Sequence, residues 1–146
     1  MHKRLTQAAV VFIVVLAAAQ FVRPVRANPA IDVSRTIQAQ ASELGAVLDR
    51  SCRDCHSNAT VWPGYTQVAP LSWLMSYAVT KGREVVNFSE WNRSYELALY
   101  SGQSIRTGNM PPIKYSMAHR EANLTEQEAR ELARGLDAML RAPGQR

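Results

Sequence analysis

The hydrophobic residues of this chain are arranged in two ways, as one continuous run near the N-terminus and as repeating stripes further along. The run is unbroken from Ala8 to Ala19 and follows the basic residues Lys3 and Arg4; counted from Leu5 to Val22, it spans 18 residues with three polar interruptions. A membrane helix needs roughly 17–25 residues, whereas the apolar core of a cleavable signal peptide is about 7–15 residues long. The pattern predicts an export signal that is retained as a membrane anchor, with cleavage after Ala27 as the alternative.

Beyond this segment, apolar residues recur three and four positions apart, which is the spacing of a buried helix face. The first stripe leads directly into Ser51 and Cys52. It consists of Ile37, Ala41, Leu44, Val47 and Leu48. A second predicted helix starts after Pro70 and ends at Lys81, with Gly82 as its C-terminal stop.

Two further helices are predicted from a capping residue followed by a stripe. Ser89 is an N-cap candidate, and the stripe after it consists of Trp91, Tyr95, Ala98, Gly102 and Ile105. Thr125 and Glu128 form a capping box, and Pro143-Gly144 closes the helix that follows. Its stripe consists of Ala129, Leu132, Ala133, Leu136, Met139 and Leu140. Little of the chain alternates as a strand does, so we predict an all-α fold.

The positive charge of the chain is concentrated at its start. Lys3, Arg4, Arg23 and Arg26 supply all but one unit of the formal net charge of +5, and no acidic residue precedes residue 28. The remainder shows no concentrated basic patch of the kind that binds nucleic acid, so we expect no nucleic-acid partner. Its length suits one small domain. We predict a signal or anchor segment at residues 1–27, a linker at 28–40 and one domain at 41–142.

The pentapeptide Cys52-Arg53-Asp54-Cys55-His56 indicates a specific chemistry. Two thiols separated by two residues and followed by an imidazole form the attachment pattern of a c-type haem. The thiols would add to the two porphyrin vinyl groups as thioethers, and His56 would be the proximal iron ligand. Because this attachment requires export, it agrees with the N-terminal segment. The sequence predicts one covalent haem c.

Other interpretations of the cysteine pair remain open. A structural disulfide is possible outside the cytoplasm, but it gives His56 no role. A zinc site could recruit Cys52, Cys55, His56 and His119, although zinc sites prefer a separated second pair of ligands. A thioredoxin-like redox pair would need a βαβ neighbourhood, which the sequence does not indicate.

The sixth coordination position of the iron has two candidate ligands. Met110 precedes Pro111 and Pro112, whose fixed φ angles indicate a loop that can hold the methionine side chain in one direction. A His/Met pair suits electron transfer. His119 is the alternative distal ligand, and Met110 would then fill the core.

Several side chains are candidates for the periphery of the haem. The haem propionates could form ion pairs with Arg53, Arg83 and Arg106, although a solvated surface role is favoured for each. An indole N–H can also bond a propionate, and the chain has Trp62, Trp73 and Trp91, which could equally be core anchors.

Most of the chain resembles the small bacterial haem-binding domain proteins of cytochrome c type. The matching segments are Ser51-Cys52-Arg53-Asp54-Cys55-His56-Ser57-Asn58, Thr60-Val61-Trp62-Pro63, Ala69-Pro70-Leu71-Ser72-Trp73-Leu74, Gly82-Arg83, Asn87-Phe88-Ser89-Glu90-Trp91 and Met110-Pro111-Pro112. The resemblance implies a small cytochrome c-like helical domain around one covalent haem, exported and usually tethered to the membrane. Cys52, Cys55 and His56 carry over directly, with Met110 as the distal candidate. Gly64, Ala78 and Ile113-Lys114 depart from the family pattern, which affects the expected pocket wall but not the attachment.

We therefore expect a one-electron carrier on the periplasmic side of the bacterial inner membrane, anchored by the N-terminal helix, or soluble in the periplasm if the leader is cleaved. Its expected partners are a redox protein and the cytochrome c maturation machinery. A haem-based sensor and a haem-stabilised accessory subunit of a redox complex are the alternatives. An enzyme is not expected, since no acid/base pair can be assigned around the iron.

Overall fold

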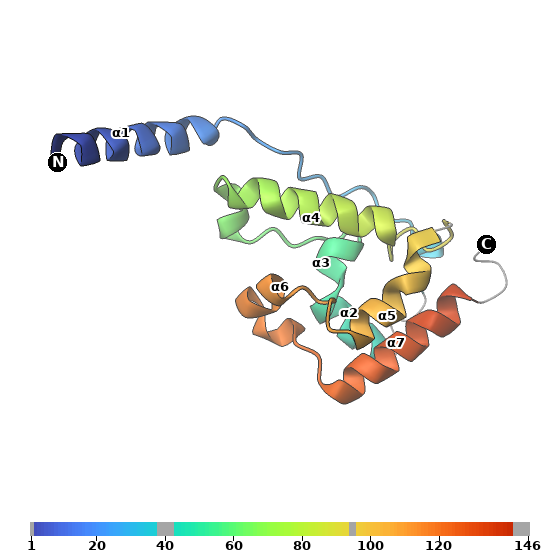
Figure 1. Ribbon diagram of the computed structural model, residues 1–146. Coiled ribbons are helices and arrows are strands. Elements are labelled where there is room, and N and C mark those ends of the chain that lie inside the picture. Colours follow the sequence, from blue (N-terminus) through green and yellow to red (C-terminus); the bar gives the residue numbers. More distant parts are fainter. Residues whose placement is uncertain (1, 38–42, 94–95, 142–146) are drawn as a thin grey trace. The chain divides into compact units, whose positions relative to one another are not determined.

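The protein divides into two compact units in a computed structural model that describes residues 2–37, 43–93 and 96–141 (Figure 1). The first unit comprises Met1–Ala27 and Trp62–Ala78, and the second comprises Asn28–Val61 and Val79–Arg146. Within the described residues all regular structure is helical. This confirms the predicted all-α class.

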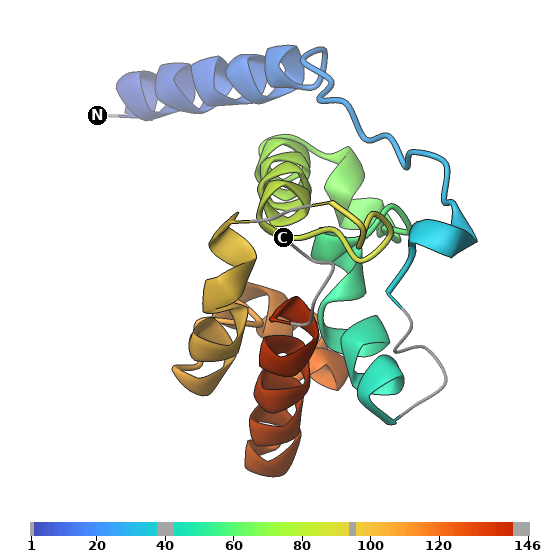
Figure 2. The same ribbon diagram turned by 90° about the vertical axis from the view of Figure 1, so that its right-hand side faces the viewer.

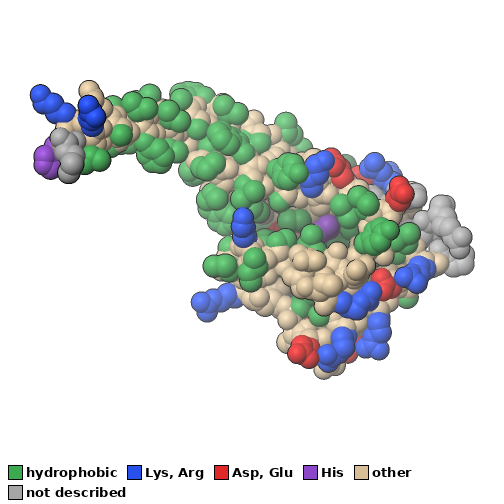
Figure 3. All heavy atoms as spheres, in the orientation of Figure 1, with side chains coloured by type: hydrophobic (Ala, Val, Ile, Leu, Met, Phe, Trp, Pro, Cys, Tyr) green, Lys and Arg blue, Asp and Glu red, His purple; other side chains and the backbone are tan. Residues whose placement is uncertain are grey.

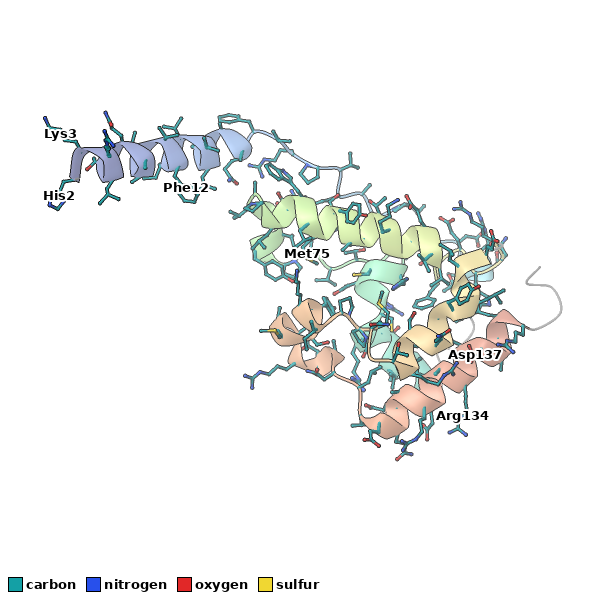
Figure 4. The ribbon with its side chains drawn as sticks, viewed as in Figure 1. His2, Lys3, Phe12, Met75, Arg134 and Asp137 are labelled. Atoms are coloured by element: carbon teal, nitrogen blue, oxygen red, sulfur yellow. The ribbon has the colours of Figure 1, made fainter. Side chains whose placement is uncertain are left out.

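The first unit begins with α1 (His2–Ala19), whose residues are almost all exposed. Figure 4 shows His2 and Lys3 at its free end and Phe12 projecting from its side. With a mean hydropathy of 1.4 over 18 residues, α1 is long and apolar enough to cross a membrane, a test that a signal sequence also passes. The unit continues with η2 (Gly64–Gln67) and the first half of α4 (Leu71–Val85).

The second unit contains the other helices. They are η1 (Val33–Arg35), α2 (Glu43–Ser51), α3 (Arg53–His56), η3 (Glu96–Tyr100), α5 (Ser101–Arg106), α6 (Ile113–Ala118), η4 (Arg120–Ala122) and α7 (Glu126–Leu140). Helix α5 lies beside α7 in both ribbon views (Figures 1 and 2). Gly102 allows this contact, because a Cβ atom at that position would collide with the Asp137 carboxylate. The buried apolar cluster includes Leu48, Val86, Phe88, Ala98, Ile105, Leu132, Ala133, Leu136 and Leu140.

Helix α7 confirms the predicted final helix. Its N-terminus carries the capping box, in which the Thr125 hydroxyl accepts from the Glu128 amide and the Glu128 carboxylate accepts from the Thr125 amide. Figure 4 shows Asp137 and Arg134 on this helix, and Asp137 forms an ion pair with Arg106 at 3.0 Å. The predicted stop at Pro143-Gly144 lies outside the described residues.

We predict that Thr125→Ala lowers the free energy of unfolding by about 1 kcal/mol, because the first-turn amide of Glu128 loses its acceptor. Urea unfolding of the full chain in detergent, followed by circular dichroism, measures the change. Thr125→Ser keeps the hydroxyl and is the matched control, which should unfold close to the wild type. Equal unfolding midpoints for the Ala and Ser variants would show that the cap contributes nothing.

The predicted third helix is wrong as one continuous element. Ser89 does not cap a helix, because its hydroxyl accepts from the Asn58 amide at 3.1 Å. The chain turns at 88–93, where the Trp91 amide donates to the Arg35 carbonyl at 2.7 Å. Helical structure resumes only in η3 and α5, while Tyr95, like Ala41 of the first stripe, lies outside the described residues.

Three other features differ from the prediction. Ile37 of the first stripe lies before α2, and its amide donates to the Phe88 carbonyl at 2.8 Å. Helix α4 continues through Gly82 to Val85, so this glycine is not a helix stop. Helix α6 was not predicted. It is short, and Ile113 and Met117 are exposed, so it has no buried apolar face whose periodicity would mark a helix in the sequence. Pro112 is the N-cap residue of α6, and both prolines lie before its first helical position, in a loop as predicted.

Candidate functional site

The attachment motif lies where α2 passes into α3. The Cys52 amide donates to the Leu48 carbonyl at 2.9 Å, and the Cys52 carbonyl accepts from the His56 amide at 3.0 Å. Leu48 is buried in the apolar cluster and fixes the end of α2. The motif therefore forms one short helical turn that starts from a well-packed helix.

Cys52 and Cys55 are both free thiols. Burial raises the pKa of the Cys52 thiol to about 12 and that of the Cys55 thiol to about 11. A redox-active cysteine pair depends on a lowered thiol pKa, so this pair lacks the electrostatics of a thioredoxin-like motif. Two protonated thiols that are not joined to each other fit the addition to vinyl groups that a c-type haem requires.

A hydrogen bond at Nδ1 orients the His56 ring. Its Nδ1 atom lies 3.2 Å from the carbonyl oxygen of Val86. A carbonyl can only accept, so Nδ1 carries the proton and the lone pair of Nε2 remains available to a metal. Burial lowers the pKa of the imidazole, against backbone hydrogen bonding to Val86 and Gly82 that would raise it. The ring is therefore held neutral, which is the form that binds iron.

A largely apolar cavity in the second unit adjoins this ring. The space inside it that a water-sized sphere can enter is about 80 Å³, less than the roughly 300–1,000 Å³ of ligand pockets. It is lined by Cys52, His56, Val85, Val86, Phe88, Leu97, Tyr100, Ser101, Ser104, Ile105, Met110 and Leu136. Cys52, His56 and Met110 thus border one hydrophobic space, and their sulfur and nitrogen atoms are donors that fit the predicted haem, whereas Cys55 does not line this space. In the space-filling view, a histidine side chain is visible among hydrophobic side chains (Figure 3).

The structure brings Met110 to the same cavity as His56. The Ser104 carbonyl accepts from the amides of Asn109 and Met110, at 2.9 and 3.2 Å, and so ties the loop to the end of α5. Gly108 makes this turn with φ of 71°, which favours glycine. Met110 remains 39% exposed.

Helix α4 packs closely against the motif at residues 52–56. A Cβ atom at Gly82 would fall on the Cys55 carbonyl oxygen and lie 2.9 Å from the carbonyl carbon. At the next position of α4, Arg83 donates from Nε to the Ser57 carbonyl at 2.7 Å and from Nη2 to the Thr60 hydroxyl at 2.8 Å. Helix α4 thus contacts both the motif and the loop that follows it.

Buried polar side chains hold that following loop. Asn87 donates from Nδ2 to the Asn58 side-chain oxygen at 2.8 Å, and its own oxygen accepts from the Ser89 amide at 3.0 Å. The Phe88 amide donates to the His56 carbonyl at 2.7 Å. Sequence reasoning missed Asn58 and Asn87 as supports, although both lie in the segments that carry the family resemblance.

His119 lies outside the lining of the cavity. Its ring stacks on Tyr115 with centroids 4.4 Å apart, and its Nδ1 lies 3.2 Å from a Glu121 carboxylate oxygen. Tyr115 in turn donates to the Asp54 carboxylate at 2.8 Å, within the motif. Burial, followed by the hydrogen bond to Asp54, raises the pKa of the Tyr115 phenol. His119 therefore has a packing role beside the motif, and its role as a distal ligand stays a prediction.

The remaining sequence candidates have these surroundings. Arg53 forms an ion pair with Asp49, Arg83 makes the contacts described above, and Arg106 is paired with Asp137. Within the part of the chain that the structure describes, the buried Trp62 indole N–H has no hydrogen-bond partner, whereas Trp73 donates to the Val22 carbonyl. Among the described residues, no group of three His, Cys, Asp or Glu side chains could hold a metal ion. The zinc alternative gains no support from this geometry.

Residues 14–138 match the family model described as a haem-binding domain. No curated protein and no solved structure matches the chain.

Proposed function

This chain belongs to the haem-binding domain family, and from that premise we propose that it carries a single haem c and transfers one electron at a time. In this proposal Cys52 and Cys55 would hold the haem through two thioether bonds, one to each porphyrin vinyl group. His56 Nε2 would be the proximal ligand of its iron and the Met110 sulfur the distal one. The protein performs no catalytic turnover.

The observation that carries the proposal is the shared cavity. Cys52, His56 and Met110 all line one space whose other walls are mostly apolar. A haem bound there would supply the one-electron chemistry. The chain's own residues would set its conditions: Val86 orients the imidazole through its carbonyl, and Phe88, Ile105 and Leu136 exclude water.

The proposed location is the outer face of a bacterial cytoplasmic membrane, with α1 as an anchor. The basic residues before the apolar run favour the cytoplasmic side for the N-terminus. The proposed partners are the cytochrome c maturation machinery, which attaches the haem, and a redox protein that exchanges electrons with it.

A haem-based sensor is the second candidate, because Met110 is 39% exposed and lies on a loop. The wild-type ferrous protein is expected to be low-spin and unchanged by carbon monoxide. Met110→Ala is expected to become high-spin and to bind carbon monoxide, because the iron loses its sixth ligand. Absorption spectra before and after the addition of carbon monoxide measure both properties.

Met117→Ala is the control for this experiment, because Met117 is 75% exposed and does not line the cavity. It should match the wild type. A low-spin spectrum retained in Met110→Ala would show that Met110 is not the sixth ligand of the iron and would favour His119 in that position. Rapid carbon monoxide binding by the wild type would favour the sensor.

A further inference from the structure

We propose that α1 is retained and that the chain from Val68 to Tyr77 rests on the lipid surface at the end of that helix. The occupant of this apolar surface would be the headgroup and upper acyl region of the outer leaflet. The proposal deepens the proposed location and rests on α1 as an anchor. All residues that carry it belong to the first unit.

The segment after α1 is fixed to the rest of its unit by hydrogen bonds at nearly every second or third residue. Gln20 bonds to both backbone groups of Ala69, accepting from its amide at 2.9 Å and donating to its carbonyl at 3.3 Å. Arg23 donates to the Gln67 carbonyl at 3.2 Å, and Arg26 donates to the Thr66 carbonyl at 2.8 Å.

Two hydrogen bonds in which the segment after α1 accepts complete this attachment. The Trp73 indole donates to the Val22 carbonyl at 2.8 Å, and the Ser76 hydroxyl donates to the Val25 carbonyl at 2.7 Å. Ser76 is buried, as is Thr66. Cleavage after Ala27 would remove the acceptor of the Ser76 hydroxyl and the Arg26 donor to the Thr66 carbonyl, and a lost partner is unfavourable for a buried polar group. Residues 20–26 therefore have the contacts of a structural segment and not those of a disposable leader.

This attachment brings exposed apolar residues to the end of the candidate membrane helix. Leu71, Leu74 and Tyr77 are spaced three residues apart on α4, and all three are exposed. Val68 is exposed just before them, and Phe21 is exposed directly after α1. Figure 3 shows hydrophobic side chains covering α1 and gathering on adjoining surface. Met75, on the same stretch of α4, is labelled in Figure 4.

The charges of this unit favour lipid as the occupant. Residues 1–27 and 62–78 contain none of the chain's 12 acidic residues, and 62–78 contain no basic residue either. Arg23 and Arg26, just beyond the apolar run, would lie at headgroup level, where basic side chains are attracted to anionic lipid. Trp and Tyr are also enriched at membrane interfaces, and this short segment contains Trp62, Tyr65, Trp73 and Tyr77.

Photo-crosslinking in vesicles tests the proposal. The full chain, matured with its cofactor, is reconstituted in vesicles of phosphatidylethanolamine and phosphatidylglycerol with p-benzoylphenylalanine in place of Leu74. The matched control carries the same amino acid in place of Leu99 of the second unit, because both leucines are 50% exposed. A third sample carries it at Tyr77, in case the change at Leu74 prevents folding. Mass spectrometry after illumination identifies the adducts.

The expected result is a chain that retains residues 1–27 and forms at least several-fold more lipid adduct at positions 74 and 77 than at 99. The proposal would be overturned if lipid adducts at positions 74 and 77 were absent, or were no more abundant than at position 99. So would adducts there to a second copy of the chain or to another protein, or a mass that shows loss of the leader. The visible spectrum of the same samples reports separately on haem, so the proposed function can survive the failure of this inference.

Discussion

The variant Cys52→Ser, Cys55→Ser is expected to retain no haem after denaturation, because serine hydroxyls do not form the two thioether bonds. The loss should be complete, and it is the largest effect that the account predicts. Each single variant should keep one thioether and therefore keep haem on the denatured chain. The measurement is the mass of each acid-denatured protein, made in a host that matures c-type cytochromes.

Serine is nearly the same size as cysteine, so the fold itself is little disturbed by the replacement. Circular dichroism of the double variant checks that α7 and the rest of the helical structure still form. Haem that stays bound to the denatured double variant would show that the attachment uses other residues. A single variant that loses all its haem would show that both bonds are needed together.

Gly82→Ala is expected to lower the free energy of unfolding by about 1–3 kcal/mol, the usual cost of overpacking. The added methyl group would fall on the Cys55 carbonyl, which is backbone and cannot rotate away. Helix α4 must then move from the motif, and the carbonyls of Gly82 and of Val86, the residue just after α4, move away from the His56 ring. Urea unfolding of the full chain in detergent measures the stability, and the yield of matured protein should fall with it.

Gly64→Ala is the matched control, because a Cβ atom at Gly64 meets nothing within 4 Å. It should unfold like the wild type or slightly later, since alanine restricts the unfolded chain. The idea of a close approach fails if Gly82→Ala and Gly64→Ala unfold at the same urea concentration.

The parts of the fold that could be predicted are those whose signals are local. The capping box of α7 and its apolar stripe are both contained in one stretch of sequence, and the helix forms as predicted. The turn at Cys52 and His56 likewise follows from a five-residue motif at the end of an amphipathic helix. Local consistency of this kind is what makes an element readable from sequence alone.

The parts that could not be predicted depend on contacts between distant residues. Gly82 has the local appearance of a helix stop, but its lack of a side chain serves the approach to Cys55. Ser89 has the local appearance of an N-cap, but its hydroxyl is used by the amide of Asn58. In both cases a tertiary contact overrides the local preference.

The candidate site shows the same division. The motif identifies Cys52, Cys55 and His56 without a structure, whereas Met110 is 54 positions beyond His56 in the numbering and only the fold brings the two to one cavity. The sequence offered His119 as a second candidate, and the Pro111-Pro112 pair that favours Met110 indicates a loop but not where that loop lies. Their different surroundings, a shared cavity for Met110 and a stacked tyrosine for His119, are tertiary facts.

The most direct test of the central claim is the mass of the wild-type full chain, denatured in acid after production in a host that matures c-type cytochromes. We predict a coloured protein whose mass is that of the polypeptide plus one haem, with residues 1–27 still present. A colourless protein with the mass of the polypeptide alone would contradict it.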